Sequence, residues 1–139
     1  MSALGNVGGT SYPAVKFKNI GDNVAGRIIS IEDFQETEYA DDPAKGVKKG
    51  DLKFYPSGDP IMGVKVGLET IPGDETSRVT LYVQGKRLMK AVATAFRRAG
   101  AADLEEGADL AVVHPGYDGR AKAYSAEYSR PVIEDEPPF

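Results

Sequence analysis

Apolar and polar residues alternate along most of this chain, and the spacing changes in one segment only. In residues 62–69, for example, Met, Val, Val and Leu alternate with Gly, Lys, Gly and Glu. Between Lys86 and Arg98 the apolar residues instead recur every three or four positions. A period of two is typical of a half-buried strand, and a period near 3.6 is typical of an amphipathic helix. The pattern therefore predicts a mainly β fold with one helix.

The order of these segments narrows the choice of architecture. The alternation predicts five strands, over Asn23–Tyr39, Ile61–Thr70, Arg78–Gln84, Asp109–His114 and Arg120–Tyr128. The helix over Lys86–Arg98 lies between the third and fourth strands and ends before Gly100, a residue that commonly stops helices. The resulting order, β-β-β-α-β-β, is that of the OB-fold, a small five-stranded Greek-key barrel. We expect that barrel, although other small α+β folds share the order.

Length and local composition predict one domain with two appendages. The chain has 139 residues, of which 41% are apolar, enough for one hydrophobic core. Residues 1–14 are rich in Gly, Ser and Asn and are predicted to form a flexible N-terminal extension. Residues 15–130 are predicted to form the barrel, and residues 131–139 an acidic C-terminal tail.

The sequence lacks the residues that several classes of protein need. The chain has no cysteine and a single histidine, His114, which excludes disulfides, thiol nucleophiles and zinc sites built from Cys and His. No apolar run approaches the roughly 20 residues of a membrane span. The N-terminus also lacks the pattern of a signal peptide. We therefore expect a cytoplasmic protein with no membrane contact.

Catalysis has little support in the sequence. His114 has no evident nucleophile as a partner, and the phosphate-binding and dinucleotide-binding glycine motifs are absent. Acidic side chains that could hold a metal lie at Asp41-Asp42, Asp103 and Glu105-Glu106, but no spaced ligand motif joins them. We expect no catalytic residue, no metal site and no cofactor, and hence a protein that is not an enzyme.

The charge is unevenly distributed. The chain has 17 basic and 21 acidic residues, a net charge of −4. Residues 134–139 contain three carboxylates and no basic side chain, whereas Lys45–Lys53 contains four lysines and one acid, with Phe54 and Tyr55 directly after it. That basic window lies in a long segment, residues 40–60, that is rich in Gly and Pro. A loop of this length in a compact domain is usually functional or disordered.

Cations beside aromatic rings are typical of proteins that bind single strands of nucleic acid. Such binding needs cations for the phosphates and flat rings for the bases. The lysine loop and the predicted outward strand faces supply both, and Tyr128 is placed on the same face as Tyr124. The predicted DNA-binding residues are Lys45, Lys48, Lys49, Lys53, Phe54, Tyr55, Lys65, Arg78, Tyr82, Tyr117, Lys122 and Tyr124. The basic residues of the predicted helix are interpreted as its solvated side.

The C-terminal residues resemble those of a known family. Three acidic residues, two prolines and a terminal Phe139 resemble the C-terminal tip of the single-stranded DNA-binding proteins of bacteria and their phages. In that tip, Pro137 stands where an aliphatic residue is common. The resemblance implies a phage-like protein that coats single strands in replication, recombination or repair and recruits other proteins through its tip. The residues implied to bind these partners are Glu134, Asp135, Glu136, Pro137, Pro138 and Phe139.

Three alternatives to this interpretation stay open. The chain could be an accessory interaction module that has the same fold and does not bind DNA. It could be an annealing protein, which binds single strands in order to pair them. It could also be a metal-dependent nuclease that uses Asp41 and Asp42. Self-association stays open as well, because Tyr82 could pack against a second subunit.

Overall fold

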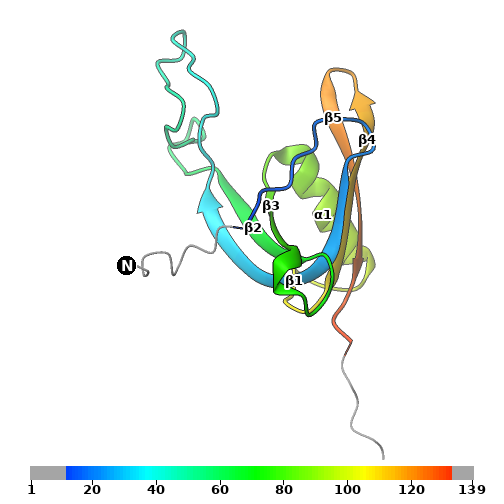
Figure 1. The fold of residues 1–139 in the computed structure, drawn as a ribbon. Coiled ribbons are helices and arrows are strands. Elements are labelled where there is room, and N and C mark those ends of the chain that lie inside the picture. Colours follow the sequence, from blue (N-terminus) through cyan, green and yellow to red (C-terminus); the bar gives the residue numbers. More distant parts are fainter. Residues whose placement is uncertain (1–11, 133–139) are drawn as a thin grey trace, which may run out of the picture.

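The structure, a computed structural model, describes residues 12–132 and contains one antiparallel sheet with one helix (Figure 1). The strand order across the sheet is β3-β2-β1-β4-β5. The strands are β1 (Asn23–Gln35), β2 (Met62–Glu69), β3 (Arg78–Val83), β4 (Asp109–Asp118) and β5 (Ala121–Ser129). Helix α1 (Lys86–Arg98) follows β3, and a short 3-10 turn, η2 (Glu75–Ser77), lies between β2 and β3. The prediction of a mainly β fold with five strands and one helix is confirmed.

Strand β1 is the centre of the sheet and bends strongly along its length (Figure 1). Its first half pairs with β4 and its second half with β2, and Arg27 lies opposite a residue of each. At Gly26 a Cβ atom would lie 2.6 Å from the carbonyl oxygen of Glu69, so the bend requires glycine here. A bulge between Ile28 and Ser30 adds to the curvature. The curved sheet can therefore wrap around a core.

The core lies between the concave side of the sheet and α1. The fully buried residues of the strands include Ile28, Val66, Leu68, Leu81 and Leu110, and the helix adds its own apolar face. The core residues of β2 and β3 are the ones that the two-residue period placed inward. Their burial removes apolar surface from water, which is the main favourable contribution to folding.

The predicted closed barrel is not confirmed, because no ladder within residues 12–132 joins β3 to β5. These two strands are the edges of an open sheet. Helix α1 packs mainly against β5 and also contacts β3. Residues 12–22, the crossing segment, run from one edge toward the other (Figure 1). The crossing segment bonds to Thr80 of β3 through Pro13 and Val15, at 2.8 Å each, and to His114 of β4 through Gly21, at 2.7 Å. The crossing segment thus pairs with the edge of β3 that a ladder with β5 would need.

Some boundaries differ from the predicted ones. Strand β1 ends at Gln35 rather than Tyr39, and β4 continues to Asp118 through the turn predicted at residues 115–119. After a bulge that follows Val113, Gly116 and Tyr117 resume pairing with β5, so Pro115-Gly116 does not end the strand. Of the predicted appendages, residues 1–11 and 133–139 lie outside the described residues. Between residues 12 and 132, no helix combines the length and the apolar character needed to cross a bilayer.

Candidate nucleic-acid interface

Residues 36–61, here called the arm, project from the ends of β1 and β2 (Figure 1). Thr37 pairs with Leu52 across the arm, and Phe54 pairs with Pro60 across a second, shorter loop of residues 54–60. At its root the N–H of Glu36 donates to the carbonyl of Ile61 at 2.7 Å, and the N–H of Lys53 donates to the carbonyl of Glu36 at 2.8 Å. The long loop predicted from the sequence is therefore a paired projection.

The acidic residues of the arm shape its tip. A carboxylate oxygen of Asp41 accepts from the N–H of Lys49 at 2.8 Å, and one of Asp51 accepts from the N–H of Lys48 at 2.8 Å. Asp42 accepts in the same way from Ala44 at 3.1 Å. The Asp41-Asp42 pair thus satisfies main-chain donors. Within residues 12–132, no group of three or more His, Asp or Glu side chains is arranged to hold a metal ion.

The lysines at the tip of the arm present their charges to solvent. Lys45, Lys48 and Lys49 are exposed. No carboxylate among the described residues lies within 4.0 Å of their ammonium groups. Phe54 and Tyr55, which follow Lys53 in the chain, are 55% and 47% exposed. The arm therefore carries free cations at its tip and exposed aromatic rings in the loop beside its root.

Lys53, by contrast, is held at the root of the arm. Its ammonium lies 3.8 Å from one carboxylate oxygen of Glu36, a residue that is only 5% exposed. The other oxygen of Glu36 accepts from the N–H of Gly85 at 3.3 Å, where α1 begins. Glu36 therefore connects the arm to the helix and partly neutralises Lys53.

Phe34, Tyr82 and Lys65 form an aromatic platform on the outer face of β1, β2 and β3, beside the root of the arm. The rings of Phe34 and Tyr82 meet edge to face, with centroids 5.6 Å apart. Lys65 lies opposite Tyr82 in the β2–β3 register, and Gly63 lies opposite Phe34 in the β1–β2 register. A Cβ atom on Gly63 would come within 2.9 Å of the Phe34 ring, so glycine at this position lets that ring lie across β2.

Phe34 is the platform residue that the sequence did not single out. The alternation placed it on one face of its strand, but nothing local distinguishes a ring that packs in a core from one that lies on an outer surface. The cross-strand glycine was the available signal, because a strand glycine often marks a place where another group approaches closely. Using that signal would have required the register between β1 and β2.

Arg78, a predicted DNA-binding residue, lies at the other end of β3 and is held by other residues. Its guanidinium donates to Glu69 at 2.9 Å and to the hydroxyl of Tyr12 at 3.1 Å, and it lies over the Tyr12 ring. The N–H of Gly73 and the guanidinium of Arg78 together lower the pKa of Glu69. The face of β2 and β3 predicted as outward is thus partly closed: Glu69 is 7% exposed and Thr80 is 2% exposed.

The last three predicted residues lie in the β4–β5 hairpin, away from the arm (Figure 1). Tyr117 is 52% exposed near the hairpin tip. Lys122 lies opposite it and donates through its ammonium to the carbonyl of Phe17. Tyr124 packs edge to face on the Phe17 ring at 5.5 Å, and burial raises the pKa of its hydroxyl. Lys122 and Tyr124 therefore anchor the crossing segment.

The prediction that Tyr128 lies on an exposed face is wrong. Its side chain is 9% exposed, it packs against Phe96 of α1, and its hydroxyl donates to Glu105 at 3.0 Å. The helix covers this end of β5, which strand periodicity could not reveal. His114 is also fully buried, with Nδ1 3.0 Å from the carbonyl of Ala123 and its ring 5.0 Å from that of Tyr117.

Comparisons with protein-family models, with curated proteins and with solved structures found no match to this chain.

Proposed function

We propose that this chain binds single-stranded DNA without sequence preference and coats it during replication, recombination or repair. The observation that carries the proposal is the aromatic platform at the root of an arm whose tip exposes lysines without carboxylate partners. Exposed rings stack on bases of any sequence, and the cations attract the phosphates that connect them. A surface that offers both within one continuous region matches the chemistry of a single strand better than that of a duplex, whose bases are already stacked.

The proposed path of the strand follows the arm to the platform. Lys45, Lys48 and Lys49 attract the phosphate backbone at the tip, where they are exposed. Bases then stack on Phe54 and Tyr55 and, at the root, on Tyr82 beside Phe34. Each stacked base contributes about 1–3 kcal/mol in proteins of this kind. Arg78, Lys122 and Tyr124 have a positioning role in this proposal, because their polar groups or rings already contact other residues.

We further propose that the fold is an opened form of the OB-fold. Its central strand pairs with both β2 and β4, as the first strand of a five-stranded Greek-key barrel does. OB-folds bind oligonucleotides on the face of their second and third strands and with the loops that follow the first and fourth strands. In this chain those positions correspond to the platform, the arm and the tip of the β4–β5 hairpin, where Tyr117 is exposed. The predicted tip, residues 134–139, keeps its proposed role in recruiting replication and recombination proteins.

A titration of fluorescent oligo-dT, about 30 nucleotides long, across a salt series with a duplex competitor tests the proposal. We expect preference for the single strand and a loss of affinity of about tenfold or more in the double variant Phe34→Ala/Tyr82→Ala, because two stacking surfaces are removed. Ile71→Ala is the control, since it removes an exposed apolar side chain beyond the opposite end of β2, and its affinity should stay near that of the wild type.

Other results would favour the alternatives. Absence of binding at low salt would contradict the proposal and leave the accessory interaction module. Equal affinity for duplex and single strand would indicate attraction between charges without base stacking. If the protein binds single strands, a strand-annealing assay with complementary oligonucleotides separates a coating protein, which slows pairing, from an annealing protein, which accelerates it.

A further inference from the structure

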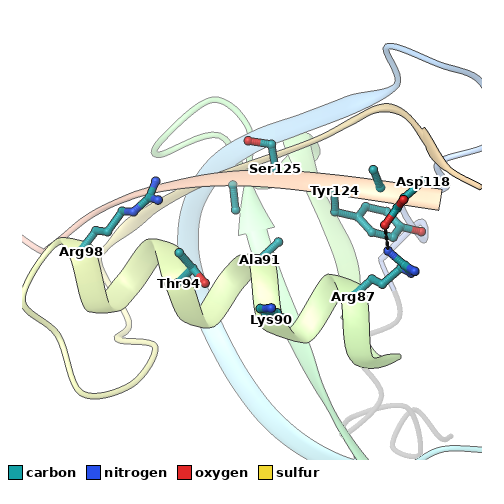
Figure 2. A pocket seen from close by; sticks show the side chains of 10 residues that line it. Arg87, Lys90, Ala91, Thr94, Arg98, Asp118, Tyr124 and Ser125 are labelled. Atoms are coloured by element: carbon teal, nitrogen blue, oxygen red, sulfur yellow. Dashed lines mark hydrogen bonds and ion pairs between the residues drawn. The ribbon is translucent and has the colours of Figure 1, made fainter. Parts of the chain in front are cut away.

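A trough runs along the outer edge of β5, between that strand and α1 (Figure 2). Its central part has a volume of about 350 Å³, with Arg87, Lys90 and Arg98 on the helix side and Tyr124 and Ser125 on the strand side. A second hollow of about 510 Å³ shares Arg87 and Tyr124 with the central part, and a third of about 240 Å³ shares Arg98. The three hollows together follow the whole length of α1.

The strand that borders this trough has a free main-chain edge. Strand β5 pairs with β4 on one side only. Outside that ladder, the one main-chain group of β5 with a partner among residues 12–132 is the carbonyl of Ala123, which His114 contacts. The other edge of the sheet differs, because Pro13 and Val15 of the crossing segment bond to Thr80 of β3. An unpaired strand edge can pair with the backbone of another extended chain.

The helix that borders the trough is strongly basic. Helix α1 has five basic residues and no acidic residue, in a chain whose net charge is −4. Within residues 12–132 only one of the five, Arg87, has a carboxylate within 4.0 Å, that of Asp118 at 2.8 Å. Lys86 and Arg87 lie in the first turn, where the helix dipole favours anions, so helix stability does not account for them. The basic side of the trough is complementary to an anionic partner.

A peptide matches this trough better than a nucleic acid does. Tyr124 is the one aromatic residue of the central trough, and its ring packs on Phe17 rather than lying free for a base. The free edge of β5, in contrast, offers main-chain donors and acceptors in the spacing of a strand. We propose that an extended acidic peptide of a partner protein adds to β5 as a further strand, with its carboxylates facing Lys90 and Arg98.

The spacing of the cations predicts the pattern of the peptide. Lys90 and Arg98 are eight residues apart on α1, which corresponds to about 12 Å along the helix axis. Side chains four residues apart on one face of a strand are separated by about 13 Å. Acidic residues at positions i and i+4 of the peptide therefore meet the two cations. Asp118 and Glu127, which line the two ends of the trough, disfavour further acids there. This surface is separate from the proposed DNA path.

The test is a fluorescence anisotropy titration of the full chain with a labelled short peptide of alternating Glu and Val. We expect the double variant Lys90→Glu/Arg98→Glu to bind at least tenfold more weakly. Arg97→Glu is the matched control: it makes the same change of charge on the same helix, but the guanidinium lies over the Phe96 ring, outside the trough lining. Its affinity should stay within about twofold of the wild type, since distant exposed charges are largely screened. Melting curves of each variant establish that it is folded.

A second peptide separates strand addition from attraction between charges. N-methylation of alternate peptide bonds removes main-chain donors and keeps every carboxylate, so binding should be lost if the peptide pairs with β5. Equal binding of the methylated peptide overturns the proposal, as does absence of binding of the unmodified peptide up to about 1 mM. Oligo-dT titrated against the same variants gives a distinct outcome: a loss for Lys90→Glu/Arg98→Glu as large as for Phe34→Ala/Tyr82→Ala would show that the trough carries nucleic acid.

Discussion

The tip of the arm and helix α1 both expose cations, and their neighbours differ. The lysines at the arm tip belong to a projection that also carries two exposed aromatic rings, Phe54 and Tyr55, and the arm leads to the platform. The cations of α1 stand beside an open strand edge and among small side chains such as Ala91 and Ser125. A cation alone attracts any anion, whereas rings favour bases and a strand edge favours a peptide backbone. The neighbouring groups therefore favour different ligands for these two sets of exposed cations.

Reversing the exposed cations of the arm tip or of α1 should have the largest effect on binding. We expect Lys45→Glu/Lys48→Glu/Lys49→Glu to reduce affinity for oligo-dT by about 100-fold at low salt, and to reduce the slope of log affinity against log salt by about 2, since each phosphate contact in a single strand contributes about 0.7. The helix variant Lys90→Glu/Arg98→Glu should change both quantities far less. Equal losses in the two variants would mean that both regions serve one ligand.

A smaller change to the platform should have a smaller effect. Gly63→Ala places a methyl group against the Phe34 ring and the carbonyl of Val83, so the ring must move from its position across β2. We expect oligo-dT affinity to fall about threefold to tenfold, within the range of one weakened stacking contact. Gly116→Ala is the matched control, because a Cβ there meets no atom within 4 Å and the backbone is not left-handed. Peptide binding by the trough should be the same in both variants.

Glu36 connects the two regions, and its replacement should loosen both. In Glu36→Gln the carboxylate that accepts from Gly85 and faces Lys53 becomes a neutral amide. We expect the free energy of unfolding to fall by about 1–2 kcal/mol, because a partly buried hydrogen bond to a charged group is weakened. Denaturant melts measure this loss. Glu38→Gln, a change at a more exposed acid of the arm, should leave stability nearly unchanged.

The stability contributed by the helix end of β5 should respond to alkaline pH. Burial and the hydrogen bond to Glu105 raise the pKa of Tyr128 from 10.0 to about 12. Between these two values the folded chain keeps a proton that the unfolded chain releases, so this group's contribution to stability is complete below pH 10 and declines as the pH rises toward 12. Tyr128→Phe should be less stable at neutral pH and should lose less stability over that interval. Denaturant melts of the two proteins at several pH values measure the difference. The same loss of stability between pH 10 and 12 in both proteins would contradict the raised pKa of Tyr128.

Much of the fold could be predicted because secondary structure leaves a local signal. The predicted helix has the same bounds as α1. The predicted second strand is one residue longer than β2 at each end, and the predicted third strand is one residue longer than β3 at its C-terminal end. The β4–β5 turn was placed too early, because Pro115-Gly116 is a turn signal in sequence and lies at a bulge in the structure. The closed barrel was not predictable from order alone, since closure depends on which segment pairs with the edge of β3.

The candidate site was predictable in its chemistry more than in its geometry. The lysines of the arm and Tyr82 are visible in sequence as cations and rings at exposed positions. The contacts of Arg78 with Glu69 and Tyr12 are not visible in the sequence, because the hydroxyl that Arg78 contacts belongs to Tyr12, 66 positions away. The burial of Tyr128 is likewise set by Phe96 on a different element.

The type and order of the elements, the residues that alternate toward the core, and the separation of a lysine-rich window from acidic C-terminal residues can all be inferred from the sequence. These follow from backbone geometry and composition, which act over a few residues. The open sheet, the contact of Phe34 with Tyr82 beside Lys65, and the position of the basic side of α1 at a free strand edge depend on the tertiary fold. Each of these arises where a curved sheet brings together residues that are distant in the chain, and no local period carries that information.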